Sequence, residues 1–155
     1  MRDIFRLVIS ILICQAAGII GSFFTFTSVS GWYQTINKPS FNPPGYIFGP
    51  VWIILYLMMG ISLFLIWQKK HIVSIKYPVI IFSVQLFLNT LWSIIFFGLH
   101  NPLFAFFDIL LLLVFIILTV ISFYKVSKPA SLLLIPYLLW VSFASVLNYF
   151  IVKLN

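Results

Sequence analysis

The chain has 155 residues, of which 63% are hydrophobic and only 7% are charged. Soluble globular domains carry about 25% charged residues, so the composition excludes an ordinary soluble protein and indicates that most of the chain lies in lipid. The net charge is +7, but the basic residues flank apolar runs, which favours membrane topology over nucleic-acid binding as their role. The single cysteine excludes a disulfide or a cysteine metal site within the chain.

The first apolar run begins directly after the basic residues Arg2 and Arg6 and continues from Leu7 to Phe26. Its 20 residues are enough to cross a bilayer as a helix. A signal peptide has a shorter apolar core, so we expect a retained first span over about residues 4–26.

A segment rich in proline and aromatic residues follows, reading GWYQTINKPSFNPPGYIFGPVW from Gly31 to Trp52. Its four prolines restrict the backbone and disfavour a helix throughout the segment. Loops longer than about 12–15 residues are commonly lids or binding segments, and the six aromatic rings carry much apolar surface with few polar tips. We therefore expect a stiff lid loop over residues 28–44, covering a pocket for a flat, apolar ligand.

Four further apolar runs are each long enough to cross a bilayer. Lipid cannot satisfy open backbone groups and the runs lack the alternation of barrel strands, so helices are expected. The predicted fold is an all-α membrane protein, a five-transmembrane-helix bundle that forms one integral membrane domain over residues 1–155 and carries the long Pro/aromatic-rich loop between its first two helices. The expected spans cover about residues 4–26, 45–67, 77–99, 102–124 and 130–152.

Basic residues are distributed unevenly between the two ends of such a bundle. Seven lie on the side of the N-terminus, whereas only Lys38 and Lys153 lie on the other side. The positive-inside rule therefore predicts a multi-pass protein of the cell membrane with a cytoplasmic N-terminus and an exterior C-terminus. The seven residues are Arg2, Arg6, Lys69, Lys70, Lys76, Lys125 and Lys128.

Three amide side chains, Gln85, Asn89 and Asn148, fall inside the predicted third and fifth spans. In lipid such groups point inward, where they either form hydrogen bonds between helices or contact a ligand. The two roles are balanced for Gln85 and Asn148, whereas Asn89, one turn from Trp92, favours the ligand.

Asp108 is the only acidic residue within a span. An intramembrane carboxylate is a functional-site hypothesis by default, and a hydrogen-bonded structural group is the alternative; proton-coupled transport would require Asp108 to titrate. The chain shows no Ser-His-Asp set, no paired histidine ligands and no phosphate-binding glycine loop. We expect no metal site, and the residues leave open whether the protein is an enzyme.

Four stretches together resemble the TspO/MBR family, the tryptophan-rich sensory proteins related to mitochondrial translocator protein, and in particular its bacterial members. They are WYQTINKPSFNPPGYIFGPVW from Trp32, QLFLNTLWSIIFF from Gln85, PLFAFFDI from Pro102 and PYLLWVSFASVLNYF from Pro136. The resemblance covers nearly the whole chain. It implies a five-helix bundle that forms a homodimer and binds porphyrins and some synthetic isoquinoline or benzodiazepine ligands.

The resemblance also implies a function. Protoporphyrin-type tetrapyrroles are expected to bind as ligand or substrate, with no tightly bound cofactor, and to undergo light-dependent oxidative degradation. Trp52 and Trp140, as electron-rich indoles on facing helices, are the expected catalytic residues. Transport or sensing of tetrapyrroles or other hydrophobic ligands without turnover is the alternative. The implied pocket residues are Tyr33, Pro43, Phe48, Trp52, Tyr56, Asn89, Trp92, Ser93, Trp140 and Ala144.

Overall fold

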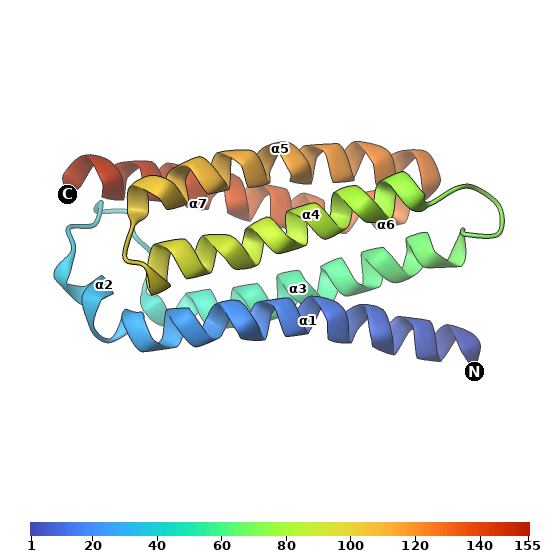
Figure 1. Ribbon diagram of the computed structural model, residues 1–155, viewed down its shortest axis with the longest axis horizontal. Coiled ribbons are helices and arrows are strands. Elements are labelled where there is room, and N and C mark those ends of the chain that lie inside the picture. The colour runs from blue at the N-terminus through green and yellow to red at the C-terminus, as the bar shows by residue number, and fades with distance from the viewer.

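The computed structural model describes residues 1–155 and consists of helices joined by connectors. Five helical segments are long and apolar enough to span a membrane, and they run roughly along one common axis (Figure 1), which confirms the expected membrane bundle. The long helices are α1 (Arg2–Val29), α3 (Gly45–Gln68), α4 (Lys76–Ser93), α5 (Pro102–Val126) and α7 (Ile135–Leu154). The short elements are α2 (Trp32–Thr35), the π-helix η1 (Ile94–Gly98) and α6 (Lys128–Leu132).

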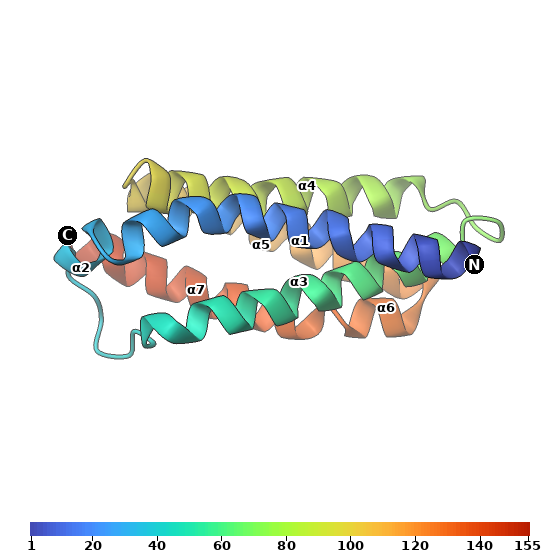
Figure 2. The same cartoon turned by 90° about the horizontal axis from the view of Figure 1, so that it is seen from below.

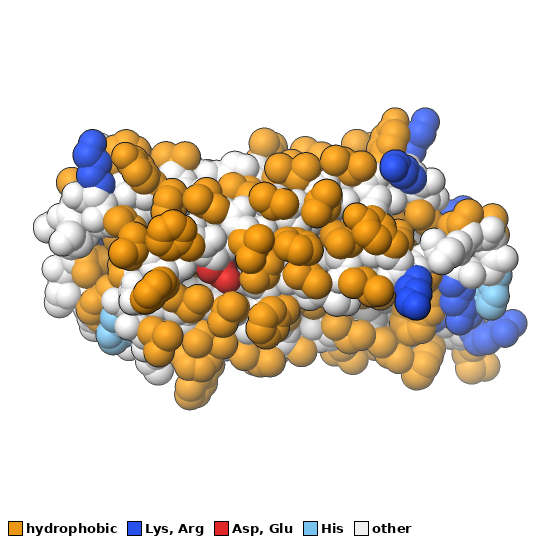
Figure 3. Space-filling view, turned by 45° about the horizontal axis from the view of Figure 1, so that its top comes forward, with side chains coloured by type: hydrophobic (Ala, Val, Ile, Leu, Met, Phe, Trp, Pro, Cys, Tyr) orange, Lys and Arg blue, Asp and Glu red, His pale blue; other side chains and the backbone are white.

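A band of apolar side chains covers the middle of the molecule on the face shown in Figure 3. Lys and Arg side chains lie at the two ends of this band, and most of them gather at one end. The N-terminus, the α3–α4 connector and α6 all lie at that end, whereas α2 and the C-terminus lie at the other (Figure 1). The charge asymmetry expected from the sequence is therefore an asymmetry between the two ends of the bundle.

Helices α1 and α3 pack closely because glycine removes the side chains that would separate them. A Cβ placed on Gly60 would lie 2.7 Å from the Cα of Ile11, and one on Gly18 would lie 2.6 Å from the ring of Tyr56. Small residues allow helix backbones in a membrane to approach in this way. The two helices lie farther apart toward the end that carries α2 (Figure 2).

A buried chain of hydrogen bonds joins α3, α4 and α7. The Tyr56 hydroxyl donates to Asn89 Oδ1, Asn89 Nδ2 donates to the Tyr137 hydroxyl, and that hydroxyl donates to Gln85 Oε1, each over 2.7 Å. All four side chains are buried. Of the two roles considered for Gln85 and Asn89, the structure shows hydrogen bonding between helices, which satisfies polar groups that lipid cannot.

The third span ends in the π-helix η1. Here Leu99 N–H donates to the carbonyl of Ile94 over 2.9 Å, an i to i+5 bond, and the Ser28 hydroxyl of α1 donates to the carbonyl of Phe97. Short π segments occur frequently at functional sites. This one places the neighbouring rings of Phe96 and Phe97 on one cavity wall.

The fifth span is divided into α6 and α7 at Leu133 and Leu134. Pro136 lies in the first turn of α7. A proline ring clashes with the carbonyl four residues earlier, here that of Leu132, and donates no backbone hydrogen bond. Helix α6 therefore ends at Leu132 and a new helix begins at Ile135, instead of one helix continuing through Pro136 with a kink.

The connector between α1 and α3 differs from the loop expected over residues 28–44. Helix α1 continues to Val29, α2 adds a helical turn, and α3 begins at Gly45, so only residues 30–31 and 36–44 lack helix. A long structureless loop is therefore not supported. The prolines break the helix only locally, because Pro44 precedes the first residue of α3 and Pro50, inside it, removes a single backbone donor.

Replacing Asn89 with leucine tests the role of the buried chain of hydrogen bonds. Asn89→Leu leaves the Tyr56 hydroxyl without an acceptor, and we expect the free energy of unfolding to fall by about 1–2 kcal/mol. Removing that hydroxyl first, with Tyr56→Phe, should reduce the cost of Asn89→Leu. Unfolding of both single variants and the double variant in detergent measures the coupling, and strictly additive losses would contradict the hydrogen bond's contribution.

Candidate ligand cavity

A cavity of about 700 Å³ lies among α1, α3, α7 and the end of the third span, beside α2. This volume falls within the roughly 300–1,000 Å³ typical of small-molecule sites. None of the lining residues carries a charged side chain, and most are hydrophobic. The cavity therefore suits an apolar ligand with few polar groups.

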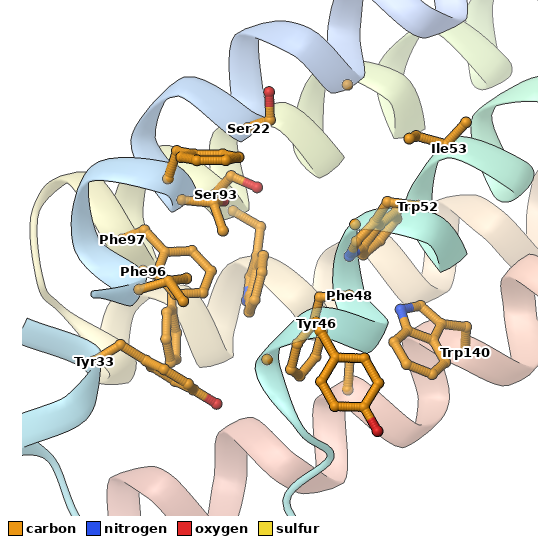
Figure 4. Close-up of a pocket in the computed structure, with 18 of the residues that line it drawn as sticks. Ser22, Tyr33, Tyr46, Phe48, Trp52, Ile53, Ser93, Phe96, Phe97 and Trp140 are labelled. Atoms are coloured by element: carbon orange, nitrogen blue, oxygen red, sulfur yellow. The ribbon is translucent and has the colours of Figure 1, made fainter. Parts of the chain in front are cut away.

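Aromatic rings occupy opposite sides of this cavity (Figure 4). Trp52 and Phe48 of α3 lie on one side together with Trp140 of α7, and the rings of Phe48 and Trp140 meet edge to face with centroids 6.0 Å apart. Tyr33 and Phe96 lie on the other side. Flat rings on both sides provide surfaces on which a planar conjugated molecule can stack.

Trp92 joins the second wall to the rest of the bundle. Its ring stacks on Phe96 with centroids 5.0 Å apart, and its indole N–H donates to Asn148 Oδ1 over 3.0 Å. Asn148 Nδ2 in turn donates to the carbonyl of Pro102 over 2.9 Å. Asn148 therefore holds three helical segments together and also lines the cavity.

The indole N–H of Trp140 is the cavity's unused donor. It is buried and has no hydrogen-bond partner, although buried polar groups are normally paired. Because this nitrogen is closed off in the structure, a ligand oxygen becomes its acceptor only after the Trp140 ring shifts and opens the N–H to the cavity.

The connector that borders the cavity is held by its own hydrogen bonds. The Tyr33 hydroxyl donates to Asn42 Oδ1 over 2.8 Å, and Lys38 Nζ donates to the carbonyls of Tyr33 and Ile36 over 2.7 and 3.0 Å. Burial raises the pKa of the Tyr33 phenol above its usual value, and the hydrogen bond with Asn42 offsets this only in part. The phenol thus stays protonated at neutral pH and keeps its donor role.

Most of the residues predicted for the pocket do line the cavity. Pro43 and Asn89 do not: Pro43 lies in the connector, and the Asn89 amide is occupied by Tyr56 and Tyr137. The eight that line it are Tyr33, Phe48, Trp52, Tyr56, Trp92, Ser93, Trp140 and Ala144.

A whole wall of the cavity, contributed by α1, was not predicted. Gly18, Ser22 and Thr25 are spaced by four and three residues and so share one helical face. A stripe of small and polar residues within an otherwise apolar helix is the sequence pattern from which this cavity wall could have been predicted. The further lining residues outside the prediction are Gln15, Gly18, Ile19, Ser22, Thr25, Phe26, Val29, Ser30, Gly45, Tyr46, Gly49, Ile53, Phe96, Phe97, Leu147, Asn148 and Ile151.

Asp108 lies on α5 and does not line the cavity. Its side chain is buried, and Oδ2 has no hydrogen-bond partner. An unpaired buried carboxyl oxygen is costly in an apolar environment. Asp108 is therefore a second candidate functional residue, and it is separate from the cavity.

Comparison with known proteins places the chain among relatives of similar length. The sequence model of the TspO/MBR family matches residues 10–154. The chain is 48% identical to the tryptophan-rich protein TspO of Chlorobaculum tepidum, over 99% of this chain and 98% of that protein. It is 38% identical to the human translocator protein, over 84% of this chain and 78% of that protein. It is 31% identical to the tryptophan-rich sensory protein of Cereibacter sphaeroides, over 80% of this chain and 77% of that protein.

The family match spans nearly the whole chain. The matched residues include all or most of each of the five helices that are long and apolar enough to span a membrane. The comparisons and the fold therefore lead to one conclusion: the chain is a multi-pass membrane protein that belongs to the TspO/MBR family.

Proposed function

We propose that the protein, as a homodimer in the cell membrane, binds protoporphyrin-type tetrapyrroles in its cavity and promotes their light-dependent oxidative degradation. The observation that carries the proposal is an uncharged aromatic cavity of about 700 Å³ in which Trp52 and Trp140 lie on the same side (Figure 4). Relatives named translocator protein and tryptophan-rich sensory protein support, more broadly, a membrane role in sensing or translocation.

Binding would rest mainly on stacking and burial. A tetrapyrrole is flat and conjugated, and the aromatic rings on both sides of the cavity offer it offset-stacked or edge-to-face contacts, which contribute about 0.5–1.5 kcal/mol per pair beyond area burial. The unused indole N–H of Trp140 would then donate to an oxygen at the edge of the ligand. This single donor would orient the macrocycle, while the carboxylates of a protoporphyrin-type ligand, for which the lining offers no cation, would have to stay solvated outside the apolar part of the cavity.

The ligand would supply the light chemistry, while the protein contributes binding and orientation. An illuminated porphyrin activates dioxygen, which is the oxidant. Trp52 and Trp140 would provide electron-rich indoles in contact with the macrocycle, able to take part in electron or oxygen transfer. Phe48, which meets Trp140 edge to face, would keep that indole in position.

Replacing each cavity tryptophan separates binding from chemistry. Trp52→Phe and Trp140→Phe keep an aromatic ring for stacking, so we expect protoporphyrin still to bind in the dark, while loss of its Soret band under light slows by about tenfold or more. Trp67→Phe is the matched control, because Trp67 lies at the far end of α3 and does not line the cavity.

Two outcomes would count against the proposal. Unchanged photodegradation in both cavity variants would reject the chemical role of the indoles. Absence of any saturable quenching of tryptophan fluorescence by protoporphyrin in the dark would reject tetrapyrrole binding itself.

Transport of tetrapyrroles or other hydrophobic ligands is a second candidate, favoured by the unpaired Asp108 oxygen. A carboxyl group that gains and loses a proton inside a membrane is typical of proton-coupled transporters. If Asp108 serves this role, uptake of protoporphyrin into liposomes under a proton gradient should be lost in Asp108→Asn while dark binding is kept. No uptake by the unaltered protein under any gradient would exclude transport.

The orientation proposed places the N-terminus in the cytoplasm and the C-terminus outside, because the N-terminal end of the bundle carries seven of the nine basic residues. A reporter fused after Asn155 that is active only outside the cytoplasm, such as a periplasmic phosphatase, should be active. A cytoplasm-only reporter at the same position should be silent, and the reverse pattern would invert the assignment.

A further inference from the structure

The cavity reaches the lipid-facing surface between α1 and α3. Four residues that line it are largely exposed: Ile19 (68%) and Phe26 (85%) on α1, and Tyr46 (79%) and Ile53 (61%) on α3. We call the gap bordered by these four side chains the window. Because this flank of the bundle is membrane-facing, only movable side chains separate the cavity from the lipid here.

Close approaches between α1 and α3 border the window at both ends. At one end Gly18 packs against the ring of Tyr56, and Gln15 Nε2 donates to the carbonyl of Ile53 over 3.1 Å. At the other end a methyl group of Val29 lies 3.8 Å from the position of a Cβ on Gly45. The helices separate between these contacts (Figure 2).

The size of the window follows from this frame. The stretch of α1 between Gly18 and Val29 rises by about 16 Å at 1.5 Å per residue. Its height is therefore comparable with the size of a drug-like or macrocyclic ligand.

The end of the cavity nearest α2 is closed more firmly. The side chain of Asn155 accepts from the N–H of Asn37 and donates to its carbonyl, both over 2.9 Å, and Asn37 Nδ2 donates to the carbonyl of Leu154 over 3.3 Å. The bond between Tyr33 and Asn42 adds to these. Opening the connector breaks several hydrogen bonds together, whereas opening the window requires only rotation of exposed side chains.

We infer that the cavity exchanges its ligand sideways with the bilayer, through the window, while the connector stays closed. The ligands are then molecules that partition into lipid, and they arrive from the half of the bilayer nearest α2. The uncharged lining agrees with this class. The inference deepens the proposed function, on which the choice of a tetrapyrrole rests, but the route can be tested without one.

A cysteine introduced inside the cavity reports the route. Ala144 lines the cavity from α7, so Ala144→Cys in lipid vesicles is treated either with pyrene maleimide, which partitions into lipid, or with a charged, water-soluble thiosulfonate. The parent protein, whose only cysteine, Cys14, is fully buried, gives the background.

Variants at the rim identify the opening. We expect pyrene maleimide to label the introduced thiol. The double substitution Ile19→Trp and Ile53→Trp should slow this labelling by about tenfold or more, because the larger side chains would obstruct the window. The matched control is Ile20→Trp with Ile54→Trp, since both residues are comparably exposed (53% and 56%) and neither lines the cavity. Asn155→Ala should leave labelling by either reagent unchanged.

Two results would overturn the inference. One is that Asn155→Ala accelerates labelling by the charged reagent while Ile19→Trp with Ile53→Trp has no effect on labelling. The ligand would then enter through the connector. The other is no labelling of folded protein when denatured protein is fully labelled. The proposed function can fail while this inference holds. In that case pyrene maleimide labels the cavity cysteine through the window, but protoporphyrin does not bind the protein.

Discussion

Lipid offers no hydrogen-bond partner, so each polar group inside this bundle has to find one within the protein. The hydrogen bonds that run from Tyr56 through Asn89 and Tyr137 to Gln85 meet that demand across three helices. They also fix where α3, α4 and α7 meet. Because these helices are held together on one side of the cavity, α1 and α3 are able to separate on another without loss of the fold.

The cavity is the consequence of that separation. Glycine at positions 18 and 60 brings α1 and α3 into close contact over one half of their length, whereas beyond residue 18 the approach of Val29 to Gly45 is looser, with 3.8 Å between a Val29 methyl group and a Cβ placed on Gly45. The space that remains is filled only partly by aromatic side chains. Phe96 and Phe97 reach it together because η1 changes the helical register just where the third span approaches α2.

Long apolar runs and short connectors were sufficient to predict the five helices, since lipid leaves few alternatives to a helix of about 20 residues. The aromatic residues of α3 and α7 that line the cavity were predictable from their motifs. The sequence does not show that the Asn89 amide is occupied by two tyrosines, because that depends on three helices meeting. The contribution of α1 was missed for a related reason, since Ser22 and Thr25 form a wall only where α3 has moved away.

The unpaired indole N–H of Trp140 has an energetic consequence for the protein on its own. A donor removed from water without an acceptor costs roughly 1–3 kcal/mol, and this cost persists as long as no acceptor reaches it. Any guest that brings an oxygen to this atom relieves the cost and raises resistance to heat according to its concentration relative to its dissociation constant. The protein's persistence in the membrane is thereby linked to the supply of its guest.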